Sequence, residues 1–278
     1  LGYRNTIDPL HIYMGNPLLR NSHSHTTTYN YHRMWLRKQI VLGLNVSYNK
    51  DINPIATLYR YNSTTGAYES KPMNVKGGDM WKFGFNYDQG IGVYFRLMNK
   101  FKVLTSKSYG FLTIVDNNDP NAVPDLNLQK RLGIDENFDL SYEAEKVQLT
   151  LFNNLQWNRY RYDDDTYNSS PLYNSLGISV RLKLSPLEMY IRLSDDFRKG
   201  YATSEMNGHK LMSMASISYG FCKNKCRLSL FVDDIFNKDI WYDNNYSAFQ
   251  RTETTTNYMH HYANLTFSYR FDAKAKKK

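Results

Sequence analysis

The last alternating stretch of the chain, residues 261–271, places strong limits on how the chain can fold. Apolar side chains occupy every second position there, and polar side chains occupy the positions between them. The first set is Ala263, Leu265, Phe267, Tyr269 and Phe271, and the second is Tyr262, Asn264, Thr266, Ser268 and Arg270. Because side chains alternate across a strand, the segment has one apolar and one polar face over about ten residues. This pattern is typical of a strand that crosses a membrane between lipid and a polar lumen.

The same alternation recurs along the whole chain. It is found at residues 40–48, 81–87, 132–142, 176–184, 189–193 and 228–232, where Val41 is apolar on the polar side and Glu136 interrupts an apolar row. No helical period competes over comparable lengths. Strands are therefore predicted near residues 22–31, 37–61, 66–88, 91–116, 127–142, 146–162, 172–184, 187–198, 209–221, 226–236 and 258–271. The sequence predicts an all-β, antiparallel transmembrane β-barrel.

Short and long connections largely alternate between these strands. Short ones are expected near 32–36, 89–90, 143–145, 185–186 and 222–225, and longer polar ones near 117–126, 163–171, 199–208 and 237–257. Since short turns of such barrels face the periplasm and long loops face outward, the alternation supports a barrel. The turn at residues 62–66 is the exception, and we interpret it as the tip of two strands that project beyond the bilayer.

The predicted count of about eleven strands is odd, whereas single-chain bacterial outer-membrane barrels use even numbers. Open sheet edges need partners. We therefore interpret residues 1–271 as the C-terminal part of an outer-membrane β-barrel and residues 272–278 as a basic C-terminal tail. The expected location is the bacterial cell outer membrane.

Composition agrees with a barrel and excludes a transmembrane helix. The mean hydropathy is −0.62 and no apolar run is long enough to cross as a helix. A barrel keeps this mean low because only alternate residues touch lipid. Aromatic residues make up 15% of the chain, which fits aromatic girdles but also an aromatic-rich soluble sugar-binding protein.

Three segments resemble TonB-dependent outer-membrane receptors of the Bacteroidetes type. They are DPLHIYMGNPLLRNSHSHTTTYNY at 8–31 with its GNP turn, LSLFVDDIFNKDIWY at 228–242 with its DIFNK motif, and the terminal NLTFSYRF at 264–271. The resemblance implies a barrel of about 22 strands with a plug domain, of which this chain is the second half, importing a scarce nutrient with energy from TonB.

The resemblance also implies partners. These are outer-membrane lipid, an N-terminal barrel half with its plug domain, TonB through an N-terminal region, and a surface lipoprotein. The family's plug domain and TonB box do not occur in these residues. The nutrient, whether siderophore, glycan, peptide or cofactor, is left open, and no resident cofactor is expected.

The net charge of +9 is typical of proteins that bind nucleic acid. The cations are spread over the strands rather than clustered, however, which disfavours nucleic-acid binding. Several are expected to face the lumen, namely Arg96, Arg181, Lys183, Arg192, Arg227 and Arg270. One interpretation is a pore lining paired with Asp88, Asp139 and Asp233. The other is an electropositive path for an anionic ligand such as a metal–siderophore complex.

Further candidates lie in loops and turns. Trp241, Tyr242, Tyr246 and Phe249 in the longest outer loop suit stacking on a sugar or aromatic ligand, although Trp241 and Tyr242 also fit the aromatic girdle. Cys222 and Cys226 are as compatible with a disulfide as with free thiols. His23 and His25 share a strand face without an obvious third ligand, so no metal site is expected. Asp163, Asp164 and Asp165 are interpreted as a solvated loop tip rather than a calcium site.

No phosphate-binding loop, nucleophile elbow or zinc-protease motif occurs, so the chain is not expected to be an enzyme. Two alternatives to transport stay open. One is a structural or surface-binding barrel that transports nothing, and the other is a soluble β-sandwich, which the long predicted strands disfavour.

Overall fold

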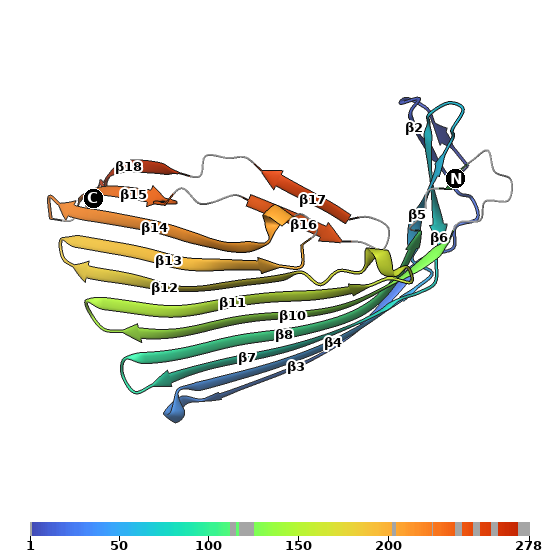
Figure 1. Ribbon diagram of the computed structural model, residues 1–278. Helices are drawn as coiled ribbons and strands as arrows, with labels where there is room; N and C mark the ends of the chain where they lie inside the picture. The colour runs from blue at the N-terminus through green and yellow to red at the C-terminus, as the bar shows by residue number, and fades with distance from the viewer. Residues whose placement is uncertain are drawn as a thin grey trace, which may run out of the picture.

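A computed structural model describes residues 2–111, 115–116, 125–201, 204–223, 225–236, 241–246, 251–256 and 261–271. Its main feature is a curved sheet of eleven strands in which sequence neighbours pair antiparallel (Figure 1). In spatial order the strands are β18 (Tyr262–Tyr269), β15 (Cys226–Asp233), β14 (Gly208–Phe221), β13 (Leu187–Lys199), β12 (Leu172–Leu184), β11 (Val147–Arg161), β10 (Leu126–Glu143), β8 (Phe95–Phe111), β7 (Asp79–Ile91), β4 (Ile40–Ile52) and β3 (His23–Trp35). The all-β fold with mostly antiparallel strands is thus confirmed, and the sheet is open between β18 and β3.

The two faces of this sheet differ as the alternation predicts. Apolar residues on one face stay accessible, with Leu176 51% and Leu265 66% exposed. On the other face polar residues are packed, with Ser175 4% and Ser194 6% exposed. We call these the apolar face and the polar face. Crowding of small polar side chains on one side is expected when that side lines the inside of a curved sheet.

Three of the predicted strands are divided rather than continuous. The segment 37–61 divides into β4 and β5 (Ile55–Tyr61), and 66–88 divides into β6 (Tyr68–Asn74) and β7. Asn53 has a positive φ of 50° at the first break. At the second, a Cβ on Gly77 would lie 2.1 Å from the backbone oxygen of Asp51, so the chain passes where a side chain does not fit. Alternation alone does not reveal these breaks. The segment predicted at 91–116 likewise comprises β8 and a separate β9 (Val115–Asp116).

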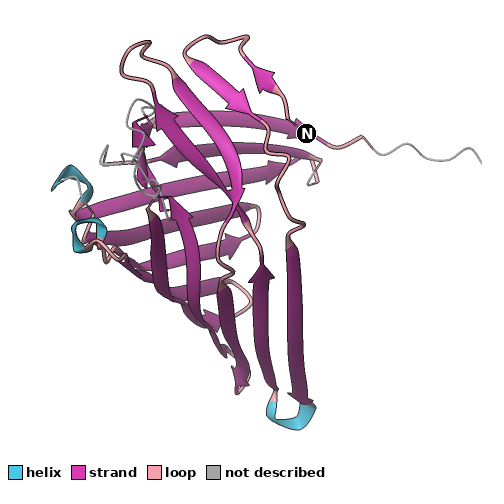
Figure 2. Cartoon of the chain, turned by 90° about the vertical axis from the view of Figure 1, so that its right-hand side faces the viewer, coloured by secondary structure: helices cyan, strands magenta, loops and turns pink. Residues whose placement is uncertain are grey.

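The displaced segments build a second, five-stranded sheet. Its order is β1 (Arg4–Asn5), β2 (His11–Met14), β6, β5 and β9. It projects from the end of the large sheet that carries the long connections (Figures 1 and 2). Leu58, Val75 and Phe111 form the buried apolar cluster where it meets β8. The turn at 62–66 is therefore the tip of a projecting hairpin.

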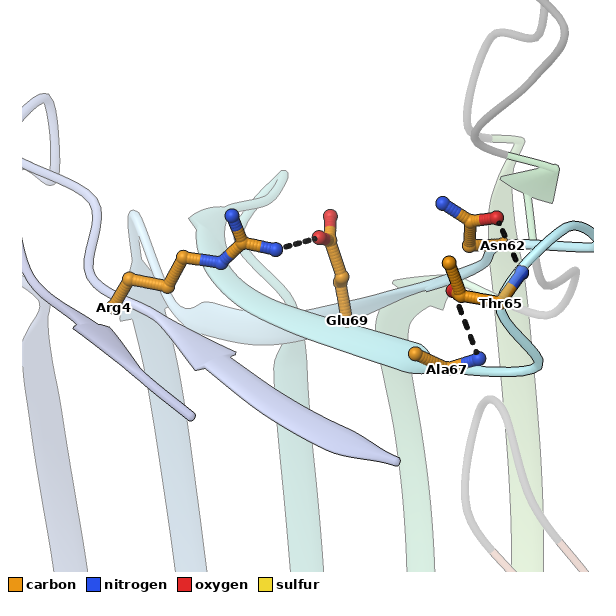
Figure 3. Close-up of polar contacts among 5 residues, drawn as sticks. All are labelled: Arg4, Asn62, Thr65, Ala67 and Glu69. Atoms are coloured by element: carbon orange, nitrogen blue, oxygen red, sulfur yellow. Dashed lines mark hydrogen bonds and ion pairs between the residues drawn. The ribbon is translucent and has the colours of Figure 1, made fainter. Parts of the chain in front are cut away.

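Polar contacts fix this small sheet and its tip (Figure 3). Arg4 Nη2 donates to Glu69 Oε1 at 2.9 Å and so ties β1 to β6. The backbone amide of Thr65 donates to Asn62 Oδ1 at 3.1 Å, and the amide of Ala67 donates to Thr65 Oγ1 at 3.4 Å. These side chains satisfy the amides that a tight turn leaves unpaired.

The long predicted loop at 237–257 contains a further hairpin of β16 (Trp241–Tyr246) and β17 (Arg251–Thr256). The described residues also contain three single 3₁₀ turns: η1 (Leu36–Lys38), η2 (Asp165–Tyr167) and η3 (Ser204–Met206). Within the described ranges, no helix has the length and apolar character needed to span a membrane. The tail, 272–278, lies outside the described residues.

Candidate functional site on the polar face

The strongest charged contact on the polar face joins two adjacent strands near the short-turn end. Arg96 on β8 donates from Nε to Asp88 Oδ1 at 2.9 Å and from Nη2 to Asp88 Oδ2 at 2.6 Å. This two-point geometry fixes both side chains, because a guanidinium presents its donors in one plane. Asp88 and Arg96 also line a hollow of about 380 Å³ together with Trp35, Tyr94 and Glu143.

Three of the other predicted cations lie on the same face toward the opposite edge of the sheet, on β12, on β15 and directly after β18. Lys183, Arg227 and Arg270 line a hollow of about 400 Å³ with Glu188, and we call this the basic hollow. Glu188 lies opposite Lys183 in the strand register and forms ion pairs with Arg227 at 3.5 Å and with Arg181 at 3.9 Å. Three cations therefore surround one carboxylate, which leaves the hollow electropositive.

Two arginines, one of them the Arg181 that pairs with Glu188, contact aromatic rings on this face. Arg181 lies 5.3 Å from the ring centre of Tyr190, and Arg192 lies 4.0 Å from that of Phe152. Cation–π contacts of this kind hold the guanidinium against the sheet. Arg181 and Arg227 thus pair with Glu188, not with the aspartates Asp139 and Asp233 that the sequence suggested as partners.

A buried carboxylate near the middle of the polar face was missed by sequence reasoning. Asp196 on β13 is 7% exposed, and its Oδ2 accepts from Tyr173 Oη at 2.9 Å. Its Oδ1 has no hydrogen-bond partner among the described residues. Arg198 lies 5.5 Å from the ring centre of Tyr173. The signal was available, because Asp196 and Glu188 both fall on polar positions of the alternating strand.

The outer-loop candidates receive little structural detail. Trp241, Tyr242 and Tyr246 belong to β16, whose side chains lie outside the described part, and Phe249 lies outside the described residues altogether. Two of the three aspartates after β11 accept backbone hydrogen bonds, one from the neighbouring strand β10 and one from within the loop. Asp163 Oδ2 accepts from the amide of Leu128 at 3.0 Å, and Asp164 Oδ1 accepts from the amide of Thr166 at 3.0 Å.

Among the described residues, neither the histidines nor the cysteines build a metal centre. No group of three or more His, Cys, Asp or Glu side chains is placed to hold an ion in the described ranges. His23 and His25 lie on the edge strand β3, facing Ile52 and Lys50 of β4. Cys222 and Cys226 are free thiols at the two sides of a turn, the first exposed and the second buried.

Comparison with known proteins gives one match. The family model described as "Outer membrane protein beta-barrel family" matches residues 2–269, which is nearly the whole chain. Comparison with curated proteins and with solved structures found no match.

Proposed function

Since the chain belongs to the outer membrane protein beta-barrel family, we propose that it is the C-terminal barrel portion of a TonB-dependent receptor that imports a scarce nutrient. The observation that carries the proposal is the polar face. It has charged pairs, a basic hollow and a buried carboxylate opposite a face of exposed apolar residues. Lipid on one side and a polar path on the other are what an importing barrel requires.

The directions of the edge strands support a place within a larger barrel. Eleven strands with antiparallel neighbours leave β3 and β18 running in the same direction. Closing the sheet on itself would make this one pair parallel. A second copy with the same membrane orientation would also place β3 beside β18 in parallel. An odd number of additional strands restores antiparallel pairing at both edges, as an N-terminal barrel half would.

The proposed role requires partner proteins but no catalysed reaction. An N-terminal barrel half would complete the barrel, and its plug domain would fill the lumen. TonB would act through this N-terminal region. A surface lipoprotein would contact the end with the long loops. No residue is proposed to catalyse a reaction. The nutrient would pass along the polar face, where the basic hollow favours an anionic ligand over a cationic one.

The test is uptake by cells that carry or lack the native gene. Cells are given labelled iron–siderophore, haem, cobalamin or oligosaccharide, with and without a protonophore. We expect one class of label to enter in a gene-dependent and protonophore-sensitive manner. If no class does so while the protein is present in the outer membrane, the importer role is wrong and a barrel without a transport function takes its place.

Two arginines test whether the nutrient is anionic. Arg181→Ser combined with Arg192→Ser removes two cations from the polar face. We expect weaker binding of an anionic ligand, by about tenfold if both charges contact it. Unchanged affinity would mean that these arginines only line the lumen. Lys146→Gln, in the short turn after β10, is a control that removes a charge outside the strands.

A further inference from the structure

A group of cations lies on the apolar face at the end with the long loops, where the lumen hypothesis does not use them. In the strand register Lys107 on β8 lies opposite Lys130 on β10, and Lys130 lies opposite Arg161 on β11. Arg159 precedes Arg161 by two residues and shares its face. All four side chains are exposed. We call Lys107, Lys130, Arg159 and Arg161 the outer basic patch.

The outer basic patch borders the apolar rows. Arg159 lies opposite Leu132, and the next pair on this face toward the short-turn end is Trp157 with Ile134. On the neighbouring strands, Trp81 and Phe83 of β7 continue these rows and are 39% and 44% exposed. The cations therefore adjoin the long-loop end of these apolar rows. Trp side chains at such a border are typical of the interface between hydrocarbon and headgroups.

Few carboxylates neutralise the charge of the outer basic patch. Among the described residues, none of its four members forms an ion pair, whereas Arg96, Arg181 and Arg227 on the polar face have carboxylate partners. Asp79 adds one acid beside Lys107, and Lys50 lies opposite Asp79. Lys76, 5.3 Å from the ring centre of Tyr109, adds another cation nearby. Like charges directly opposite each other destabilise a sheet, so an external anion would stabilise this arrangement.

We propose that the outer basic patch binds the phosphate groups of a membrane lipid headgroup. The proposal rests on the proposed function only in placing the apolar face in lipid. Acyl chains would cover the apolar rows of Trp81, Phe83 and Ile134, while the phosphates would meet the cations directly beyond them. Arginine and lysine near a membrane surface each strengthen attraction to anionic lipid. A free phosphate ion would use the cations but not the adjoining apolar rows.

The experiment measures lipid binding to the full-length protein. Purified protein in neutral detergent is titrated with lipid A, a glycolipid carrying two phosphates, and bound lipid is counted by native mass spectrometry. The variant is Lys130→Gln with Arg161→Gln. The matched control is Lys100→Gln with Lys102→Gln, two exposed lysines of β8 on the polar face. We expect the variant to bind at least about tenfold more weakly and the control to bind like the wild type.

Two further arms identify the source of the phosphate. Lipid A without phosphates should bind all forms equally weakly, and millimolar inorganic phosphate should fail to displace lipid A. Equal binding by variant and wild type would overturn the proposal, as would displacement by inorganic phosphate, which would indicate a site for free anions. Lys107→Gln with Lys130→Gln serves as a second variant if the first does not fold.

Membrane fractionation separates this proposal from the function. If the wild-type protein is not recovered from the outer membrane, the proposed function fails. If wild type and variant are both recovered there and bind lipid A equally, only the outer basic patch loses its role.

Discussion

At the scale of single residues, the contact between Asp88 and Arg96 is the best-defined charged interaction of the polar face. Their side chains are 32% and 48% exposed, so water weakens the attraction. Asp88→Asn should lower the free energy of unfolding by up to about 1 kcal/mol, as measured by urea titration in micelles. Asp139→Asn is the control, because Asp139 forms no ion pair within the described part of the chain. Equal losses in both variants would show that the Asp88–Arg96 pair contributes no specific stability.

Asp164, the residue that caps the N-terminal end of η2, predicts how its loop responds to acid. Hydrogen bonds from the hydroxyl and amide of Thr166 lower the pKa of Asp164 below its ordinary 3.8. A lowered carboxyl pKa gives stability that is complete above the unfolded value and is lost as pH falls through the folded value. Amide exchange at Thr166 should therefore accelerate only in strong acid. Asp164→Asn, which keeps an accepting oxygen, should remove that pH dependence; if it persists, another group titrates.

At the scale of strands, close packing on the polar face predicts which glycines tolerate a side chain. A Cβ on Gly177 would meet Phe152 Cζ at 2.3 Å and the backbone oxygen of Leu193 at 2.5 Å, whereas one on Gly84 meets nothing nearer than 3.4 Å. Gly177→Ala should destabilise by about 1–3 kcal/mol and Gly84→Ala by less than about 0.5 kcal/mol. Urea unfolding measures both. Equal stabilities would mean that β11 and β13 move apart freely around β12.

The strands also show how far a sequence predicts this fold. The span 172–184 was predicted with the bounds that β12 has, because its alternation is uninterrupted and its ends are turns. The break between β4 and β5 was missed, since it depends on how closely Gly77 approaches Asp51 in another strand. The β16–β17 hairpin was missed because its strands, WYDNNY and RTETTT, lack an apolar row. The site was predicted as a set of cations. Glu188 and Asp196 fall on polar positions of the alternating sequence, but which residues they contact depends on the register across strands.

At the scale of the whole molecule, the open sheet predicts that strands from outside this sheet protect the backbone amides of its two edge strands from hydrogen exchange. The strands β3 and β18 have neighbours on one side only, so half of their backbone groups lack a ladder partner. Lipid provides no hydrogen bonds, and an edge left open there would cost several kcal/mol for each unpaired group. In the full native protein, the amides of both strands should exchange as slowly as those of the central β11, with one copy of the chain in each particle. Hydrogen exchange with mass spectrometry measures the first, and native mass the second. Fast exchange at either edge, or two copies in each particle, would rule out completion by an odd number of strands.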